Sequence, residues 1–425
     1  MSGYRILSAV SLPDYLAGIG EVARRLGGDP RDWRVRDVAD GNLNHVFLVD
    51  GAEGGVCVKQ ALPYVRVAGE GWPLPPDRAF FESRYMARLA PFVGGRAPRL
   101  HHYDPDLFLM VMEKLEPHVI LRQGFIAGRY FPNAARDVAD YIATSGFQTS
   151  DLARRFEEKF DDIAIFARNQ ALTRITVDLV FADPYRESDL NRWTRPYLDR
   201  WAAAFRADTD LKLAVARFRR LFLTSGEALI HGDLHSGSVM VTDEETRVID
   251  GEFAFYGPIG FDLGAFAGNL ILAFYAQPGH ASAGDDRRRY GDWLLDQIDL
   301  FWRRFRERFL DLWRAGAAGD ALPAGHFTGE ESALDAYRMK DLDRLFADML
   351  GFTAIEMIRR VLGYAQVADF QTLADAGRRA QLQAPALSLA RAILTRPDAF
   401  KDIGDLSPAI LAHAGATLDP DLFIP

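Results

Sequence analysis

The chain has 425 residues, of which 48% are hydrophobic and 26% charged, so it can bury a large core and is long enough for two or three folding units. Its 59 acidic and 50 basic residues give a net charge of −9, which disfavours nucleic acid as a partner. Cys57 is the only cysteine, which excludes an intrachain disulfide and a metal site built from several cysteines. A single cysteine fits a reducing compartment, and we expect a cytoplasmic protein.

No export signal or membrane span is expected. The first residues lack a sustained apolar run after a basic start, which a secretory signal would have. The most apolar stretch, residues 263–276, is shorter than the about 20 residues that a spanning helix needs, and it contains Asn269. We therefore expect this stretch to be a buried helix and the protein to have no membrane partner.

The first part of the chain is predicted to be a small lobe built on an antiparallel sheet. Residues 33–60 alternate short β-rich runs with turn clusters, which is typical of a meander. Residues 75–89 then begin with proline and show the apolar spacing of an amphipathic helix. A second strand pair is predicted at residues 99–103 and 107–113. We place this N-terminal lobe at residues 1–114.

Helical periodicity dominates from about residue 115 onward. The candidate helices are 134–144, 152–169, 191–207, 212–224, 288–314, 333–376 with breaks, and 378–395. The irregular stretch 316–332 is predicted to be a surface loop between helices rather than a domain linker. The expected fold class is therefore α+β and bilobal, with a larger, mainly helical C-terminal lobe over residues 115–425.

Two aspartates in segment 231–253 have a spacing that suits phosphoryl transfer. Asp233 follows a His-Gly pair, and Asp250 ends a β-branched strand seventeen residues later. In this chemistry one carboxylate meets the attacking hydroxyl, and a second holds the metal that bridges the phosphates of the nucleotide. Either aspartate alone is equally well explained as a turn cap or a strand end. Together with His231, they predict the core of a small-molecule phosphotransferase that uses ATP and a divalent cation.

Two positions in this segment differ from the protein-kinase pattern. Ser238 stands where a protein kinase has asparagine, and Gly-Glu rather than Phe-Gly follows Asp250. On an extended segment, Glu252 would return to the face of Asp250 and offer a second oxygen ligand. That ligand could compensate for the missing amide at position 238. We assign Asp250, Glu252 and Ser238 to the metal site; a solvated carboxylate is the alternative for Glu252.

A lysine and a glutamate upstream are expected to bind the nucleotide. Lys59 lies on a strand between a glycine-bearing turn and an acidic helix, and it is expected to neutralise the α- and β-phosphates. A lone strand lysine is usually just solvated, so its position carries the interpretation. Glu82 on the helix is the expected ion-pair partner, with Glu70 and Glu113 as weaker rivals.

Further nucleotide contacts are predicted at a turn and at the connector between the lobes. The turn between two strands has backbone N–H groups that can cover phosphates, although a plain hairpin is equally probable. Its residues are Asp40, Gly41, Asn42 and Asn44. At the connector, backbone groups from Glu113 to Leu115 are expected to bond adenine while Met112 packs against the ring.

Two other groups of charged or polar residues are candidate sites. Arg359 and Arg360 form a tandem pair that is either an ordinary pair of charges at a helix C-terminus or a second positive contact in the site. The nine histidines contain no HExxH pattern, and the pair His101-His102 lacks a third ligand at metal spacing. Zinc is therefore not expected.

Five stretches together resemble the methylthioribose kinase family, within the aminoglycoside-phosphotransferase-like group of protein-kinase-like enzymes. They are DGNLNHVFLV, VKQALPYVRVAGEGWPL, HGDLHSGS, DGEFAFYGPIGFDLG and IEMIRRVLG, and they span residues 40–363. The resemblance implies a bilobal protein-kinase-like fold. It also implies transfer of the ATP γ-phosphate to the 1-hydroxyl of 5-methylthioribose, a step of methionine salvage, with Mg²⁺ and usually as a homodimer.

The resemblance assigns roles to individual residues by motif position. Asp233 matches the catalytic aspartate, Asp250 and Glu252 match the metal-binding pair, and Lys59 matches the phosphate lysine. In the mechanism that follows, Asp233 orients the sugar hydroxyl and accepts its proton late. Positioning and electrostatics then supply most of the rate.

The same resemblance indicates where the acceptor binds. Arg359 and Arg360 match the paired arginines near the sugar. Residues 69–73 match a lid loop near the active site, in which Trp72 is the expected substrate contact. Gly71 replaces the serine that is usual in the family, a difference that affects only one contact of this loop.

Two alternatives to this function remain open on the sequence. The first is a kinase of another small alcohol, such as an aminoglycoside, choline, homoserine or a different pentose, because the shared core determines the donor chemistry and leaves the acceptor to the helical lobe. The second is a nucleotide-binding pseudokinase. Intact Lys59, Asp233, Asp250 and Glu252 argue against it, since a degenerate kinase commonly loses at least one such residue.

Overall fold

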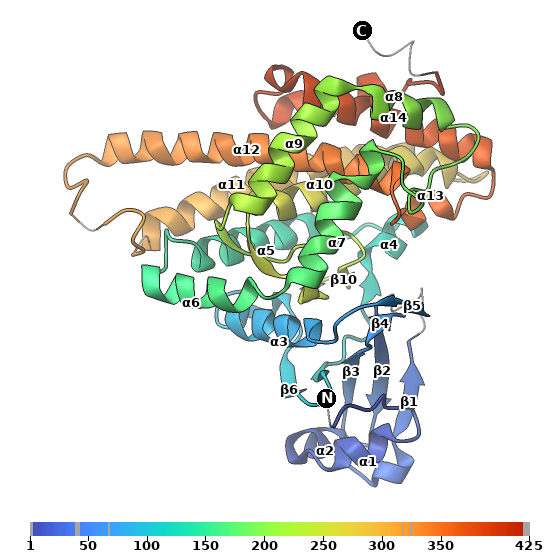
Figure 1. The fold of residues 1–425 in the computed structure, drawn as a ribbon, viewed down its shortest axis with the longest axis vertical. Coiled ribbons are helices and arrows are strands. Elements are labelled where there is room, and N and C mark those ends of the chain that lie inside the picture. The colour runs from blue at the N-terminus through green and yellow to red at the C-terminus, as the bar shows by residue number, and fades with distance from the viewer. Residues whose placement is uncertain (1–2, 39–42, 67–68, 317, 324, 420–425) are drawn as a thin grey trace.

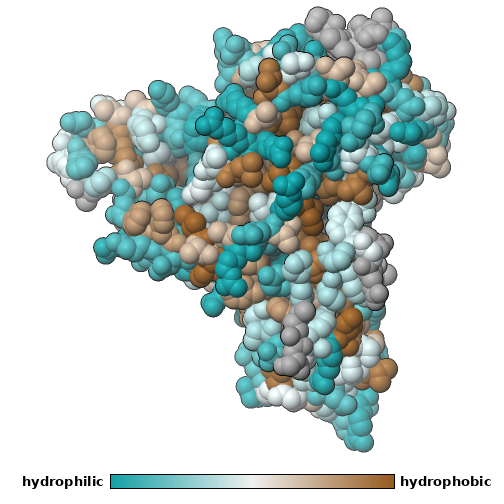
Figure 2. Space-filling view, viewed as in Figure 1, coloured by the Kyte–Doolittle hydropathy of each residue, from teal (hydrophilic) through white to brown (hydrophobic). Residues whose placement is uncertain are grey.

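The protein has a small sheet-based lobe and a larger helical lobe, as the sequence predicts (Figure 1). The computed structural model describes residues 3–38, 43–66, 69–316, 318–323 and 325–419. Polar residues cover much of the face seen in Figure 2, with hydrophobic residues exposed between them, mainly in the helical lobe. The α+β, bilobal, protein-kinase-like fold class is confirmed, while the lobe boundary between residues 114 and 115 stays a prediction.

The N-terminal lobe is built on a five-stranded antiparallel sheet with the order β1-β2-β3-β7-β6. Its strands are β1 (Arg34–Asp37), β2 (Asn44–Asp50), β3 (Gly55–Ala61), β6 (Leu100–Asp104) and β7 (Leu109–Glu113). Helix α3 (Arg78–Leu89) follows the sequence prediction. Successive side chains of β3 point to opposite faces, so Val56 and Val58 enter the core while Lys59 points to the other face. The central strand therefore carries Lys59 toward the helical lobe.

Two short N-terminal helices, α1 (Leu12–Ala17) and α2 (Gly20–Leu26), were not predicted from the sequence. At six and seven residues they are too short for helical periodicity to stand out. Their apolar residues pack on the Val56 and Val58 face of the sheet. Gln60, next to Lys59, accepts from the backbone N–H of Leu7 (2.9 Å) and donates to the carbonyl of Arg5 (2.8 Å). The N-terminal segment thus covers the sheet face opposite Lys59.

A two-stranded ribbon lies beside the sheet. It pairs β4 (Tyr64–Val65) with β5 (Gly69–Pro73). The segment predicted as a lid loop is therefore a short strand. Backbone pairing between Tyr64 and Pro73 makes this segment a strand, although glycine within a segment usually weakens a strand.

The helical lobe follows the predicted periodicity with corrections at several boundaries. Its helices are α4 (Leu121–Ala127), α5 (Ala134–Thr149), α6 (Phe156–Phe166), α7 (Gln170–Phe181), α8 (Asp199–Ala207), α9 (Thr209–Thr224), α10 (Ile259–Ala276), α11 (Arg288–Gly316), α12 (Glu331–Leu362), α13 (Ala368–Gln371), α14 (Ala376–Thr395) and α15 (Leu406–His413). Helix α7 was not predicted, and residues 191–198 are not helical. The prediction of helix with breaks over 333–376 is confirmed: α12 runs for 32 residues and ends before Gly363, and the short helix α13 follows.

Short strands of the helical lobe support the segment that contains the two aspartates. β9 (Ala228–Ile230) pairs with β12 (Phe255–Gly257), and β10 (Val239–Val241) pairs with β11 (Thr246–Val248) and β8 (Val119–Ile120). The loop after β9 carries Asp233, and the turn after β11 carries Asp250. Both aspartates therefore follow buried strands.

Helix α10 is the centre of the helical lobe. The stretch Ile259–Gly279 is long and apolar enough to cross a membrane, but 94% of its most apolar 18 residues are buried inside the protein. The expectation of a buried helix is confirmed, although the helix is longer than the sequence estimate. Gly260, Gly264 and Gly268 lie one turn apart and face α12. A Cβ at position 264 would lie 2.5 Å from the Phe352 Cβ, so the two helix backbones approach unusually closely there.

Replacing Gly264 by alanine should lower the thermal unfolding midpoint. Alanine is the better helix former by about 1 kcal/mol, but overpacking at a tight contact costs about 1–3 kcal/mol. Gly291→Ala on α11 is the matched control, because its Cβ would meet Phe274 at an ordinary 3.4 Å. Calorimetry should show a fall for Gly264→Ala and none for Gly291→Ala. Equal effects would contradict the close α10–α12 contact.

Candidate active site

The loop that carries Asp233 is held by a carboxylate in the first turn of α10. Asp262 accepts hydrogen bonds from the backbone N–H groups of His231 (2.6 Å) and Gly232 (3.0 Å). Gly232 has a positive φ of 81°, and a Cβ there would lie 2.4 Å from the carbonyl oxygen of Phe253. Backbone geometry therefore requires the glycine of the His-Gly pair, since only glycine fits this turn without strain.

The side chain of His231 joins the two aspartate-bearing segments. Its Nε2 lies 2.8 Å from the carbonyl oxygen of Ile249, and its Nδ1 accepts from the backbone N–H of Asp233 at 3.3 Å. These partners assign the proton to Nε2, which then donates to Ile249. The rings of Tyr85 and His231 pack at right angles, with centroids 5.8 Å apart. His231 thus fixes the spacing between the loop of Asp233 and the strand that leads to Asp250.

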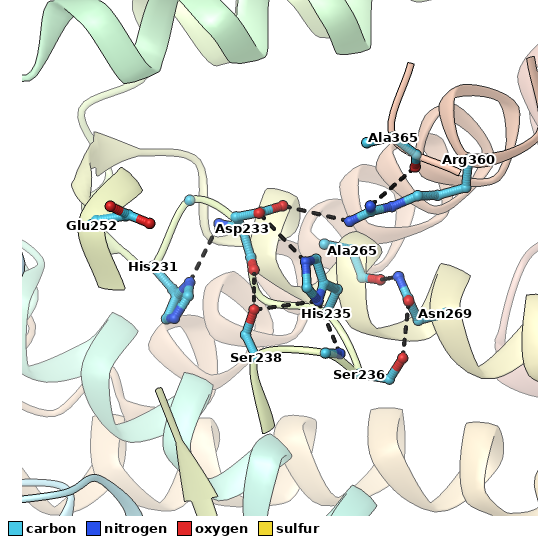
Figure 3. Close-up of polar contacts among 12 residues, drawn as sticks. His231, Asp233, His235, Ser236, Ser238, Glu252, Ala265, Asn269, Arg360 and Ala365 are labelled. Atoms are coloured by element: carbon cyan, nitrogen blue, oxygen red, sulfur yellow. Dashed lines mark hydrogen bonds and ion pairs between the residues drawn. The ribbon is translucent and has the colours of Figure 1, made fainter. Parts of the chain in front are cut away.

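Asp233 lies between two arginines, Arg359 and Arg360, and His235. Figure 3 shows it beside Arg360 and His235. Its Oδ1 is 2.9 Å from Arg359 Nη2 and 3.7 Å from Arg360 Nη2. Its Oδ2 is 3.5 Å from His235 Nε2. Burial alone would raise the pKa of Asp233, but His235 and the two arginines hold that pKa well below its usual range. The carboxylate is therefore ionised at neutral pH.

The structure places the arginine pair beside Asp233. Arg359 and Arg360 lie in the last turn of α12, where helix-end charges are common. Both side chains are nonetheless buried, and both point at Asp233. They are therefore not surface charges, and their contact with the acceptor stays a prediction.

His235 was not singled out from the sequence. Its Nδ1 accepts from the backbone N–H of Gly237 (2.9 Å), which leaves the ring proton on Nε2, facing Asp233. The pKa of His235 is lowered to about 4, mainly by burial. The negative charge of Asp233 acts to raise this pKa, and the positive charge of Arg360 acts to lower it further. A neutral His235 can therefore donate to the Asp233 carboxylate at neutral pH. Its position two residues after Asp233 is the sequence feature that could have predicted this contact.

Ser238 closes the same loop. Its Oγ donates to the carbonyl oxygen of Asp233 at 3.0 Å and lies 3.3 Å from His235 Nδ1. The residue is buried at the start of β10. The hydroxyl group thus supports the loop backbone, and the assignment of Ser238 to the metal site stays a prediction.

Lys59 is the centre of a second charge cluster, at the junction of the lobes. Its Nζ lies 2.8 Å from Glu82 Oε2 and 2.7 Å from Asp250 Oδ1. Lys59 is only 5% exposed, and burial alone would lower its pKa, but the nearby carboxylates raise that pKa well above its ordinary value. The predicted ion pair with Glu82 is confirmed. Glu113, a rival partner, instead accepts from the backbone N–H of Arg99 (3.1 Å).

The geometry expected of Glu252 is wrong. Asp250 adopts a left-handed conformation (φ 66°) and Gly251–Phe253 forms a 3-10 turn, so the segment is not extended. The Glu252 side chain is only 7% exposed, which also rules out a solvated carboxylate. It lies 3.3 Å from Arg78 Nε and accepts from Asn44 Nδ2 at 3.0 Å. Glu252 therefore joins the two lobes through buried polar contacts.

A divalent cation fits this corner of the site, with Asp250 as its best ligand. The Asp250 side chain is 47% exposed and uses Oδ1 for Lys59, whereas Glu252 is already paired. No three His, Cys, Asp or Glu side chains form a metal-binding group among the residues that the structure describes. Mg²⁺ commonly takes one or two carboxylates and completes its shell with phosphate oxygens and water. The residues present fit that pattern better than an all-protein cage.

The predicted nucleotide contacts are only partly placed. Asp40, Gly41 and Asn42 lie outside the described residues, as does the side chain of Glu70. Asn44 is placed, and its Oδ1 accepts from Arg78 Nε at 3.0 Å, so it supports the Glu252 contact. Met112 is buried on β7 opposite Cys57 of β3, and Leu115 is half-buried two residues after β7 ends. Their contacts with adenine stay predictions.

Trp72 extends from the ribbon toward the helical lobe. Its ring packs on Tyr364, with centroids 5.5 Å apart and planes 54° apart. Tyr364 follows α12 by two residues, and the next carbonyl, that of Ala365, accepts from Arg360 Nη1 at 3.1 Å. Trp72 thus reaches the helix end that carries the arginine pair, and its contact with substrate stays a prediction.

Three polar residues behind the arginine pair, two of them buried and one half-buried, were not predicted as part of the site. They are Arg122 on α4, Asn269 on α10 and Glu356 on α12. Asn269 Oδ1 accepts from Arg122 Nη2 at 2.7 Å, and its Nδ2 donates to Glu356 Oε1 at 2.9 Å. A polar residue in the most apolar stretch of the chain was the available signal, because a buried amide needs partners.

Comparisons with known proteins place the chain in a family. The phosphotransferase enzyme family (APH) matches residues 34–324. Methylthioribose kinase 1 of Oryza sativa subsp. japonica is 41% identical over 408 residues, which cover 95% of this chain and 94% of the rice protein. The chain belongs to the methylthioribose kinase family. Methylthioribose kinase of Escherichia coli O45:K1 (strain S88 / ExPEC) is 40% identical over 403 residues, or 95% of this chain and 96% of that protein.

Membership of the methylthioribose kinase family confirms the resemblance carried by the five sequence stretches. Among solved structures, a glucosamine kinase in complex with glucosamine, ADP and inorganic phosphate covers 91% of this chain and 83% of its own, with 14% identity and a TM-score of 0.46. That likeness is too distant to bear on the site. The roles of individual residues in this methylthioribose kinase family member stay predictions.

The ring of His235 should remain neutral when the pH is lowered from about 8 to about 5. An ordinary histidine becomes half protonated within this range, at a pH of about 6.5. Nitrogen NMR of labelled histidine should report the Nε2-protonated form throughout. Asp233→Asn removes an attractive charge, so the pKa of His235 should fall further in that variant. A pKa near 6.5 in the wild-type protein, or a rise in Asp233→Asn, would contradict this arrangement.

Proposed function

We propose that this protein transfers the γ-phosphate of ATP to the 1-hydroxyl of 5-methylthioribose, giving 5-methylthioribose 1-phosphate in methionine salvage. The observation that carries the proposal is the convergence of Arg359 and Arg360 on the ionised Asp233, in a chain of the methylthioribose kinase family. An acceptor pocket lined by arginines suits a neutral sugar that leaves as a phosphate. It disfavours the cationic acceptors choline and aminoglycosides, which an acidic pocket would suit.

Asp233 acts on the acceptor hydroxyl. The hydroxyl donates a hydrogen bond to the carboxylate and competes there with Arg359, whose Nη2 lies 2.9 Å from Oδ1. The hydroxyl oxygen bonds to the γ-phosphorus, the bond between that phosphorus and the β,γ-bridging oxygen breaks, and ADP leaves with its electrons. With so low a pKa, Asp233 accepts the proton only late, when the oxygen has largely bonded to phosphorus. Its main contribution is orientation.

Lys59 and Asp250 serve the donor side. Lys59, fixed by Glu82, offsets the charge of the nucleotide phosphates, and Asp250 offers its exposed carboxylate to Mg²⁺. When bound, the metal would neutralise charge on the phosphate oxygens. Glu252 and Ser238 complete the proposed metal site, and Glu252 would do so by exchanging its contacts with Arg78 and Asn44.

We also propose that the enzyme is a cytoplasmic homodimer without a nucleic-acid or membrane partner. The family resemblance supports the homodimer. The single cysteine and the net charge of −9 support the reducing compartment and the absence of a nucleic-acid partner.

Replacing Asp233 by asparagine should reduce kcat with ATP, Mg²⁺ and methylthioribose about 10²–10⁴-fold. The variant keeps the shape of the side chain but loses the negative charge that orients the hydroxyl and takes its proton. Asp243→Asn, in the exposed turn between β10 and β11, is the control and should retain wild-type turnover. A coupled assay for ADP release measures both. Near-wild-type activity of Asp233→Asn would overturn its role.

The choice of acceptor is tested with the wild-type enzyme. ADP release is measured with methylthioribose, choline, homoserine, an aminoglycoside and ribose at matched concentrations. Methylthioribose should give the highest kcat/KM. A strong preference for choline or an aminoglycoside would refute the proposed function, and magnesium-dependent ATP binding without ADP release from any acceptor would favour a pseudokinase.

A further inference from the structure

Glu356 takes no part in the proposed reaction, yet it contacts both arginines that do. This residue of α12 is only 4% exposed. Its Oε2 accepts from Arg359 Nε at 2.5 Å, and its Oε1 accepts from Arg360 Nε at 2.7 Å. We propose that Glu356 is a positioning residue that makes the two arginines converge on Asp233 and thereby sets the affinity for the acceptor. This inference rests on the proposed function, because it concerns the acceptor side of the same site.

Two neighbouring residues on a helix do not converge by themselves. At 3.6 residues per turn, consecutive side chains leave the helix about 100° apart. Arg359 and Arg360 nevertheless both reach Oδ1 of Asp233. Glu356 precedes them by three and four residues, the two spacings that bring helical side chains into contact. One carboxylate at this position can therefore draw both guanidinium groups to one side of α12.

The contacts through Nε explain how the arginines are aimed. Each guanidinium group uses its Nε for Glu356, so its Nη atoms remain for other partners. Arg359 then directs Nη2 at Asp233, while Arg360 uses Nη1 for the carbonyl of Ala365 and directs Nη2 at Asp233. Arg360 Nη2 is buried and has no hydrogen-bond partner among the described residues. A donor in that state, 3.7 Å from the catalytic carboxylate, is available to an acceptor oxygen or to the transferred phosphate.

Glu356 is itself fixed by the neighbouring helix. Asn269 of α10 donates Nδ2 to Glu356 Oε1 at 2.9 Å, and its Oδ1 accepts from Ser236 Oγ in the catalytic loop at 3.1 Å. Gly268 gives Glu356 its room, because a Cβ there would lie 3.0 Å from Glu356 Cγ. The chain of contacts joins the catalytic loop, α10 and α12, and Figure 3 shows its Ser236–Asn269 link beside Asp233 and Arg360.

The charge of Glu356 is needed as well as its shape. Burial alone would raise its pKa, but Arg359 and Arg360 lower that pKa to about 2, so the carboxylate is ionised at neutral pH. A glutamine in its place could accept from one arginine but would present an amide N–H₂ to the other Nε. The arginine facing that amide would lose its anchor and could pair more fully with Asp233, in competition with the acceptor.

The test compares Glu356→Gln with Asp348→Asn. Asp348 is a matched control because it lies eight residues earlier on α12, is buried, faces Gly260 of α10 and accepts from Arg344 Nη1 at 2.8 Å. In Glu356→Gln, the KM for methylthioribose should rise about tenfold or more and kcat should fall, while the KM for ATP stays within about twofold of the wild-type value. Asp348→Asn should leave all three constants unchanged.

A merely structural role would move different quantities. If Glu356 only stabilised the fold, both variants would lower the melting temperature alike and the KM for the acceptor would not change; that result would overturn the proposal. A background with Arg359→Lys and Arg360→Lys sharpens the test. There, Glu356→Gln should add less than about twofold to the KM, because the groups that it positions are already gone. A full additional tenfold rise would contradict the inference.

The arginine Nε–H signals test the positioning without any substrate. In nitrogen NMR, the Nε–H signals of Arg359 and Arg360 should be shifted and protected from exchange in the wild-type protein and in Asp348→Asn. In Glu356→Gln, at least one of these two signals should lose its shift and its protection. If Glu356→Gln fails to fold, Glu356→Asp keeps the charge on a shorter side chain and should show the same KM increase in weaker form. A wild-type enzyme that prefers another acceptor would refute the proposed function, and the same comparison with that acceptor would still test Glu356.

Discussion

The ion pair between Arg359 and Asp233 joins the end of α12 to the loop after β9, across 126 positions of sequence. The Asp233 carboxylate therefore has these charged neighbours only when α12 lies at the right depth against α10. The glycines at positions 260, 264 and 268 allow that close approach, and Asp262 on the same helix holds the backbone of the loop that carries Asp233. One apolar helix thus positions both partners of the pair.

The active site contains two charge clusters built in the same way. In each, a buried carboxylate fixes cations: Glu82 pairs with Lys59, and Glu356 pairs with Arg359 and Arg360. In each, a more exposed aspartate also contacts those cations, Asp250 in the first cluster and Asp233 in the second. The lysine cluster lies where the donor phosphates are proposed to bind, and the arginine cluster lies where the acceptor is proposed to bind. Paired carboxylates allow buried cations to remain charged.

The sequence predicted those features that depend on local pattern and on motif spacing. Alternation placed Lys59 on its strand, an amphipathic helix supplied Glu82, and the His-Gly-Asp turn located Asp233. The sequence did not predict contacts that depend on packing between distant segments. Glu252 was expected on an extended chain, but the left-handed Asp250 turns it toward Arg78 instead.

Other residues escaped prediction because their partners lie far away in the sequence. Asn269 was noted only as a polar interruption of an apolar helix, and its contacts with Arg122 and Glu356 appear only when three helices pack together. The helices α1 and α2 are too short for a helical repeat of apolar residues to be recognised in the sequence. The direction of Arg359 and Arg360 was undecided for the same reason, since no local pattern tells whether a helix end faces solvent or a site.

The most direct test of the central claim is phosphorus NMR of the product formed by the wild-type enzyme from ATP, Mg²⁺ and 5-methylthioribose. The account predicts one new phosphomonoester signal, split by the anomeric proton and formed in equal amount with ADP, because the 1-hydroxyl is the group that meets Asp233. A phosphate on another hydroxyl, or ADP formed without a phosphorylated sugar, would contradict it.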